Sequence, residues 1–230
     1  MASDRKRAMS LWLVAAGLVL AAVALLGTYV YANYVRGEPP AELAVGAVPT
    51  RTGAAGTVDG SWATVAGSLA GYRVEEVLAG QSVTAVGRTG AVTGSVLVED
   101  SAVLTAEIVV DMRSVRSDNS RRDAQFAGRI MQTDEYPEAR FVLAEPFRLD
   151  GLAASDGGAS YAVDGELTLR GVTAPVAASL DVVRDGPQVR IAGRIPVVFA
   201  DYGIDNPSIA GVVTTEDEGL IEVLVTLERT

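Results

Sequence analysis

The chain has 230 residues, enough for one all-β domain of ordinary size plus a smaller appendage. It contains neither cysteine nor histidine, which excludes disulfides, zinc–thiolate sites and thiol catalysis and removes the usual general base. After residue 50 there are 15 arginines, no lysine and 26 acidic residues, a net charge of −11. Such an acidic surface repels phosphate backbones, so we do not expect nucleic acid as a partner.

The first segment is strongly apolar. Residues 8–35 carry no charge, and residues 11–30 are almost wholly Leu, Val, Ala and Gly. About 20 such residues in a helix match the hydrocarbon thickness of a bilayer. The run is longer than that of a cleaved signal peptide, and tyrosines stand where a cleavage site needs small residues. We therefore predict an uncleaved transmembrane helix at residues 11–35, after a short tail at residues 1–10.

The flanking charges set the orientation of this helix. Arg5, Lys6 and Arg7 precede it, whereas Arg36 alone follows before acidic residues begin. The positive-inside rule then places the N-terminus in the cytoplasm. We expect a single-pass protein of the cytoplasmic membrane, with everything after residue 36 on the extracytoplasmic side.

Residues 36–60 are rich in Pro, Gly and Ala and predict a linker. From residue 61 to 230, short runs rich in Val, Leu, Ile and Thr alternate with turn residues, which predicts one β domain. Asp185-Gly186 and Gly171 predict tight reversals. The predicted strands cover residues 68–77, 82–89, 91–99, 102–111, 139–148, 159–170, 172–183, 188–198 and 220–228.

One segment of this domain is not strand-like. Residues 118–131 open with capping residues, and Phe126 and Ile130 are four apart, so they share one helical face. We predict a short amphipathic helix with both side chains facing inward. Strands with one inserted helix and no βαβ alternation indicate an antiparallel barrel or sandwich. An eight-stranded barrel is either filled or holds one small ligand, and the pattern leaves both open.

Three sequence blocks in this order resemble the YceI-like family of bacterial envelope lipid-binding domains. The first is Asn119–Asp123 followed by Asp134–Pro137 and residues 139–141 (ARF). The second is Gly165–Val176 (GELTLRGVTAPV), and the third is Phe199–Ile204 (FADYGI). The resemblance covers residues 68–230. Unlike many members, this chain has no histidine in its first two predicted strands.

The resemblance implies a mainly β fold: an antiparallel lipocalin-like β-barrel with one short inserted helix, here following the transmembrane helix. Such barrels enclose an apolar tunnel for a polyisoprenoid or similar amphiphile. The cavity residues expected on this basis are Phe126, Ile130, Tyr136, Phe141, Leu143, Leu167, Leu169, Phe199 and Tyr202, with about half of them facing inward. Arg88 falls where a family cation can face a headgroup, with an ordinary salt bridge as the alternative.

We therefore predict a non-catalytic, membrane-anchored binding protein that holds an isoprenoid, a quinone-like molecule or a fatty chain. No cofactor and no metal site is expected, since Glu216-Asp217-Glu218 lacks the ligand spacing of a calcium loop. The alternative is an envelope scaffold with a filled barrel that binds a protein partner through its acidic face. A glycosidase-like pair of carboxylates is compatible with the residue count, but nothing in the sequence isolates two of the acids.

Overall fold

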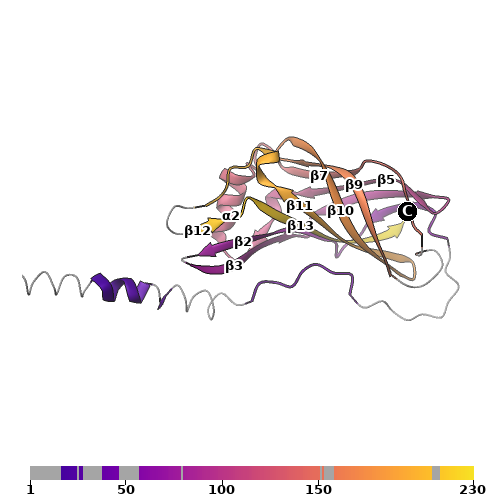
Figure 1. Ribbon diagram of the computed structural model, residues 1–230. Helices are drawn as coiled ribbons and strands as arrows, with labels where there is room; N and C mark the ends of the chain where they lie inside the picture. Colours follow the sequence, from indigo (N-terminus) through magenta and orange to yellow (C-terminus); the bar gives the residue numbers. More distant parts are fainter. Residues whose placement is uncertain are drawn as a thin grey trace, which may run out of the picture.

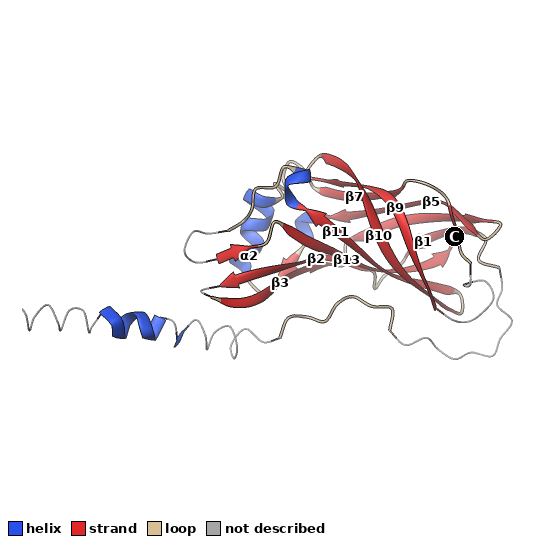
Figure 2. Ribbon diagram, viewed as in Figure 1, coloured by secondary structure: helices blue, strands red, loops and turns tan. Residues whose placement is uncertain are grey.

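The computed structural model describes residues 17–24, 26–27, 38–46, 57–78, 80–150, 152, 158–208 and 213–230. Eight strands pair antiparallel in the order β1, β4, β5, β7, β9, β10, β11 and β13, and β13 pairs with β1 to close a barrel (Figures 1 and 2). Their bounds are β1 Gly60–Thr64, β4 Val92–Glu99, β5 Ala102–Asp111, β7 Glu138–Leu143, β9 Gly158–Leu169, β10 Val172–Asp185, β11 Gln188–Val198 and β13 Glu218–Arg229.

A hairpin lengthens the barrel wall at one end. Strand β2 (Leu69–Leu78) continues the line of β1 and pairs with the first half of β13, while β3 (Gln81–Thr89) leads into β4 and pairs with β2. The strand β13 therefore has two partners in succession, β2 and then β1. Three short strands complete the sheet: β6 (Arg116–Ser117) pairs with β3, β8 (Phe147–Arg148) with β5 and β12 (Val213–Thr215) with β2.

The helical insertion lies at the same end as the tips of β2 and β3 (Figure 1). After a 3₁₀ turn, η2 (Met112–Ser114), it consists of α2 (Ser120–Gln125) and a π-helical turn, η3 (Phe126–Ile130). Asn119 caps α2, because its side chain accepts hydrogen bonds from the first free backbone N–H groups. A second 3₁₀ turn, η4 (Phe199–Tyr202), follows β11.

The adjacent Arg122 and Asp123 hold this insertion in place through different main partners. Arg122 pairs with Asp118 and, at 4.0 Å, with Glu76 of β2. The Asp123 carboxylate accepts hydrogen bonds from both the backbone N–H and the hydroxyl of Ser117, at 2.8 and 2.7 Å. The pair therefore fastens the start of α2 to β2 on one side and to β6 on the other.

Side-chain alternation explains why the strands close around a core. Along β9, Val163, Leu167 and Leu169 are buried, while Asp164 and Glu166 between them are exposed. The turns between strands need positive φ angles, which glycine adopts without strain: Gly171 has φ of 74° and Gly186 has φ of 62°.

Two apolar clusters lie toward the two ends of the barrel. The cluster at the end far from α2 includes Trp62, Leu149 and Leu152, which are at most 6 % exposed, and it closes that end. The cluster at the α2 end includes Phe126, Met131, Leu167, Leu169 and Tyr202. Residues of this second cluster, with Val96 and Val225 of the first, line the cavity that forms the candidate site.

The structure confirms the predicted fold of the domain. Eight of the nine predicted strands are present with ends that differ by at most two residues, and the ninth, at residues 139–148, is divided into β7 and β8. The predicted helix is likewise divided, into α2 and the π-helical turn. The sequence did not predict β1, β6 and β12, which have only two to five residues each and therefore show little alternation. Of the predicted span at residues 11–35, the described parts 17–24 and 26–27 are helical. Within the described residues, no helix is both long enough and apolar enough to cross a bilayer.

Candidate ligand-binding cavity

The barrel encloses a cavity of about 540 Å³, within the usual range for small-molecule sites. Inward-facing positions of several strands line it with aliphatic side chains. Examples on adjacent strands are Ile191 and Ile195 of β11, and Ile221, Val223 and Val225 of β13. A cavity with such walls favours a hydrocarbon chain over a polar metabolite, because it offers burial without hydrogen bonds.

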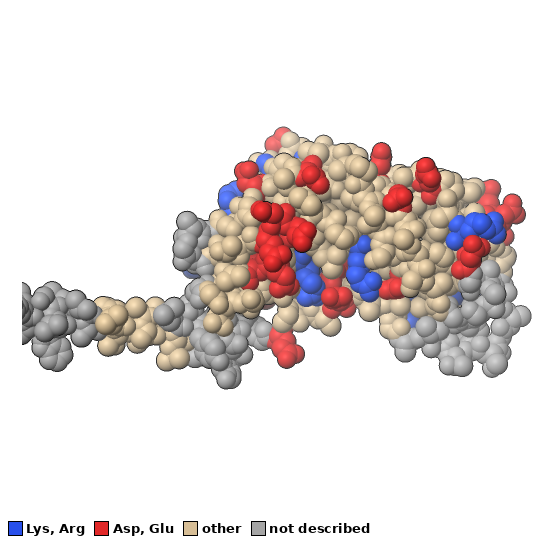
Figure 3. Space-filling view, in the orientation of Figure 1, with Lys and Arg blue, Asp and Glu red and all other residues tan. Residues whose placement is uncertain are grey.

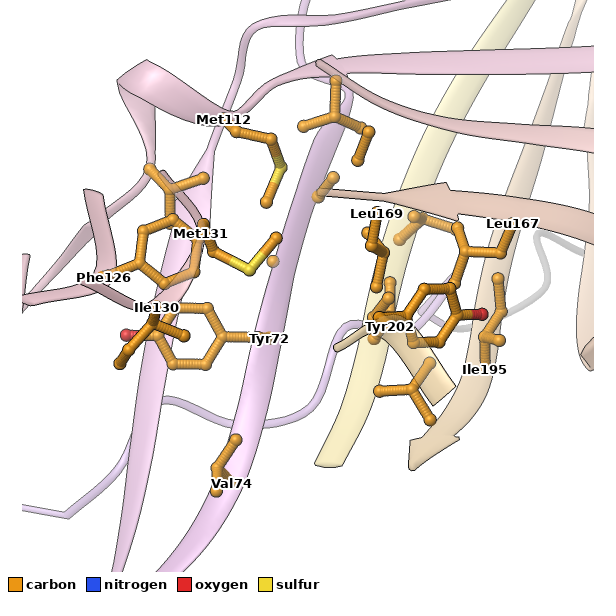
Figure 4. A pocket seen from close by; sticks show the side chains of 18 of the residues that line it. Tyr72, Val74, Met112, Phe126, Ile130, Met131, Leu167, Leu169, Ile195 and Tyr202 are labelled. Carbon is orange, nitrogen blue, oxygen red and sulfur yellow. The ribbon is translucent and has the colours of Figure 1, made fainter. Parts of the chain in front are cut away.

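Two walls face one another at the α2 end of the cavity (Figure 4). On one side the ring of Tyr72 stacks on Phe126, with centroids 5.1 Å apart and an angle of 16° between the planes. Met112 and Met131 lie beside this pair, and their flexible thioethers adapt to occupants of irregular shape. Leu167, Leu169 and Tyr202 form the opposite wall.

The polar lining is concentrated at this end, and we call the opening there the mouth. Arg121 and Gln125 of α2 line the cavity and are exposed to solvent. Arg122 and Glu76, the ion pair described above, lie beside them. Leu78, Asn119 and Pro207 also line the cavity at this end, as do Val213 and Thr215 of β12, which pairs with the tip of β2. An apolar interior with a charged opening has the chemistry of a site for an amphiphile.

The tyrosines of the lining remain neutral at physiological pH. Burial raises the pKa of Tyr72 to about 12, and burial likewise raises the pKa of Tyr202. The Tyr202 hydroxyl is fully buried and has no hydrogen-bond partner. These phenols therefore add no charge to the cavity walls.

The small residues of β3, β4 and β5 have two different roles: the glycines avoid steric clashes, and the alanines leave space in the cavity. A Cβ atom added to Gly87 would lie 2.4 Å from Cε1 of Tyr72, and one added to Gly94 would lie 2.4 Å from the carbonyl oxygen of Glu107. These glycines thus relieve crowding. Ala85 and Ala106, by contrast, line the cavity, where a larger side chain would take up its volume.

Seven of the ten predicted site residues line the cavity. They come from η3, β7, β9 and η4, which are far apart in the sequence, and the barrel brings them together: Phe126, Ile130, Phe141, Leu167, Leu169, Phe199 and Tyr202. Their part in binding stays a prediction.

The other three lie elsewhere. Leu143 packs against both apolar clusters but is outside the cavity lining. The Tyr136 ring lies against Gly171, since a Cβ there would be 2.6 Å from its Cε1. Arg88 lies on the outer wall and pairs with Glu222 at 3.2 Å, which is the salt bridge that the sequence left as the alternative.

Sequence reasoning missed other parts of the lining. Tyr72, Ala106 and Ile191 lie on strands whose existence was predicted but whose inward face was not assigned. Alternation in β2 contained a signal for Tyr72, because Tyr72, Val74 and Leu78 share one face. Nothing in the sequence indicated that Arg121 would reach the mouth.

Comparisons with known proteins agree with this geometry. The model of the YceI-like domain family matches residues 53–227. A polyisoprenoid-binding domain from Saccharophagus degradans is similar in structure, with a TM-score of 0.59 and 19 % identity over 74 % of this chain and 98 % of that one. BcnA from Burkholderia cenocepacia has a TM-score of 0.53 and 20 % identity over 67 % of this chain and 95 % of that one. The comparison with curated proteins found no match. Since the family model covers most of the chain, and the barrel agrees with it, this chain belongs to the YceI-like domain family.

Proposed function

We propose that this protein is a non-catalytic binding protein that holds one amphiphilic lipid in its barrel, with the apolar chain inside and the polar headgroup at the mouth. The observation that carries the proposal is the cavity of about 540 Å³ with its aliphatic walls and charged opening. The similar domain from Saccharophagus degradans, described as polyisoprenoid-binding, supports the same class of ligand. An isoprenoid, a quinone-like molecule and a fatty chain all have this form.

The energy available from the cavity is sufficient for useful affinity. Each buried methylene contributes about 0.8 kcal/mol, so ten methylenes contribute about 8 kcal/mol. That free energy corresponds to a dissociation constant of about 1 μM before the costs of association are subtracted. No polar contact inside the barrel is required for such binding.

The proposal includes the location predicted from the sequence. The uncharged run at residues 8–35 would hold the protein in the cytoplasmic membrane, with the barrel on the extracytoplasmic side. In that position the barrel would have a bilayer as its source of lipid. The alternative, a scaffold with a filled barrel, is less well supported because the barrel encloses an open cavity.

Native mass spectrometry of the full chain purified from bacterial membranes in mild detergent tests the proposal. We expect an adduct of defined mass, and an organic extract that yields an isoprenoid, quinone or acyl chain. An unliganded mass that persists after incubation with polyprenyl, quinone and fatty-acid lipids would contradict the proposal and favour the scaffold.

A further inference from the structure

Residues 38–46, which we call the strap, lie on the outer wall of the barrel. Arg73 Nη2 donates a hydrogen bond to the carbonyl oxygen of Pro40 at 2.7 Å, and Arg88 donates one to that of Ala41. Leu43 of the strap is only 5 % exposed. Although the sequence predicts a linker here, this part of it is fastened to the domain.

A buried ion cluster forms the base of this attachment. The Glu222 carboxylate, 1 % exposed, pairs with Arg73 and Arg88 at 3.2 Å each. The same two arginines hold the strap carbonyls, so the cluster connects β2, β3, β13 and the strap. Arg194 of β11 adds a looser ion pair with Glu42, at 3.8 Å.

The strap runs along the barrel from near the mouth toward the opposite end. Residues 38–40 border a small surface cavity with Ser82–Thr84 and Arg116–Asp118, beside the start of α2 and therefore near the mouth. At the other end, a Cβ on Gly46 would lie 4.0 Å from Arg190 Nη1, farther along β11 from the mouth. Figure 1 shows this course beneath the barrel. The chain therefore enters the strap at the mouth end.

The covalent connection to the predicted span is short. That span ends at residue 35, and residue 38 is three residues later. Three extended residues reach at most about 10 Å. Residue 38, near the mouth, would therefore lie within about that distance of the point where the span leaves the bilayer.

A second observation places apolar side chains at the same end. Val77, Val172 and Val198 are 41 %, 39 % and 43 % exposed. They lie at the end of β2, the start of β10 and the end of β11, which all meet at the mouth end of the antiparallel barrel. Within the described part of residues 57–230, they are the only large aliphatic side chains that are exposed.

The charges at the mouth end do not favour attraction to anionic lipids. Arg121 and Arg129 of the insertion are exposed near the mouth, but the acidic residues 216–218 lie at the same end. Acidic side chains are also spread over the face of the barrel shown in Figure 3. Contact with a bilayer at this end is favoured by the short connection to the predicted span and by the three exposed valines, not by attraction to anionic lipids.

We infer that the strap holds the barrel with its mouth against the bilayer that contains its own N-terminal segment, so that lipid enters the cavity directly from the membrane surface. This inference rests on the proposed function for both the membrane span and the lipid ligand. The partner of the mouth-end surface is a lipid bilayer.

Site-specific quenching in liposomes containing the full chain tests the inference. Because the chain has no cysteine, Val172→Cys and Pro187→Cys each give one site for a fluorophore, the first at the start of β10 and the second in the turn just after its end. The 14 residues of that strand span roughly 45 Å. With nitroxide-headgroup lipids as quenchers, we expect quenching at position 172 to be several-fold stronger than at position 187. Equal quenching, or stronger quenching at position 187, would overturn the inference.

Two strap variants test the cause of the orientation. Leu43→Asp puts a charge at the buried position and should abolish the difference between the two labels. Ala44→Asp, its matched control at an exposed position, should preserve the difference. An unchanged difference in Leu43→Asp would overturn the role of the strap.

Two further readouts on the same samples separate this inference from the proposed function. The first is flotation with the liposomes, and the second is uptake of a fluorescent fatty acid. If the chain floats and takes up lipid but the labels are equally quenched, the orientation alone is refuted. If the chain does not float, or floats without taking up lipid, the corresponding part of the proposed function is refuted, and the inference is refuted with it.

Discussion

Substitution of Ala106 tests whether the cavity is the place where lipid binds. Ala106 lies on β5 opposite Val96 of β4, lines the cavity and is half-buried. A phenylalanine at this position would direct its ring into the open space. Thr105, the preceding residue, is exposed on the opposite face of the strand, so Thr105→Phe is a matched control.

The expected loss of affinity follows from the volume that the ring removes. The change from alanine to phenylalanine adds six carbon atoms to the wall. If they displace only three methylenes of a bound chain, at about 0.8 kcal/mol each, the loss is about 2.4 kcal/mol. This corresponds to a dissociation constant about 50-fold higher.

Displacement of a fluorescent fatty acid measures this effect on the full chain. We expect about 50-fold weaker binding for Ala106→Phe and unchanged binding for Thr105→Phe, with near-ultraviolet circular dichroism showing that both variants fold. Undiminished binding by folded Ala106→Phe would refute the reasoning, because it would place the ligand outside this part of the barrel.

Three other predictions concern the stability of the domain. Glu222→Gln should lower the free energy of unfolding in urea by about 3 kcal/mol, because it leaves two arginines without their buried anion; Glu228→Gln, at an exposed site, should change it little, and equal effects would contradict the prediction. Tyr202→Phe should leave the free energy of unfolding unchanged or raise it by about 1 kcal/mol, since the buried hydroxyl has no partner; a loss of that size would reveal a partner. The pKa of Tyr72 is raised from 10.0 to about 12, so the folded state holds the phenol proton more strongly than the unfolded state does. The contribution of this proton to the free energy of unfolding is complete below pH 10 and is lost as the pH rises from 10 to 12. Tyr72→Phe should therefore lose less stability than the parent over that interval, by about 2 kcal/mol; parallel pH profiles would contradict this.

The strand pattern was predictable because one face of each strand is buried. Residues 159–170 alternate between buried and exposed positions almost without exception, and the structure shows β9 over nearly the same range. Gly171 and Gly186 mark reversals because their positive φ angles suit glycine. The inward direction of Phe126 was also predictable, since its spacing from Ile130 defines a helical face.

What the sequence did not show depends on contacts between distant segments. Arg88 is equally compatible with a headgroup and with a salt bridge until Glu222, 134 positions away, is placed beside it. The strap has the composition of a spacer, and its attachment to the barrel becomes visible only when distant residues such as Arg73 of β2 and Arg88 of β3 are placed against it. The volume of the cavity likewise depends on the relative placement of strands, which local alternation does not determine.

The most direct test of the central claim is to locate a bound lipid by crosslinking. The full chain would be incubated with an isoprenoid that carries a diazirine on its apolar chain, irradiated and digested for mass spectrometry. We predict adducts on residues that line the barrel from several strands, such as Tyr72, Ala106, Leu167 and Ile191. Adducts confined to outward-facing residues or to the strap would contradict the claim that the barrel holds the lipid.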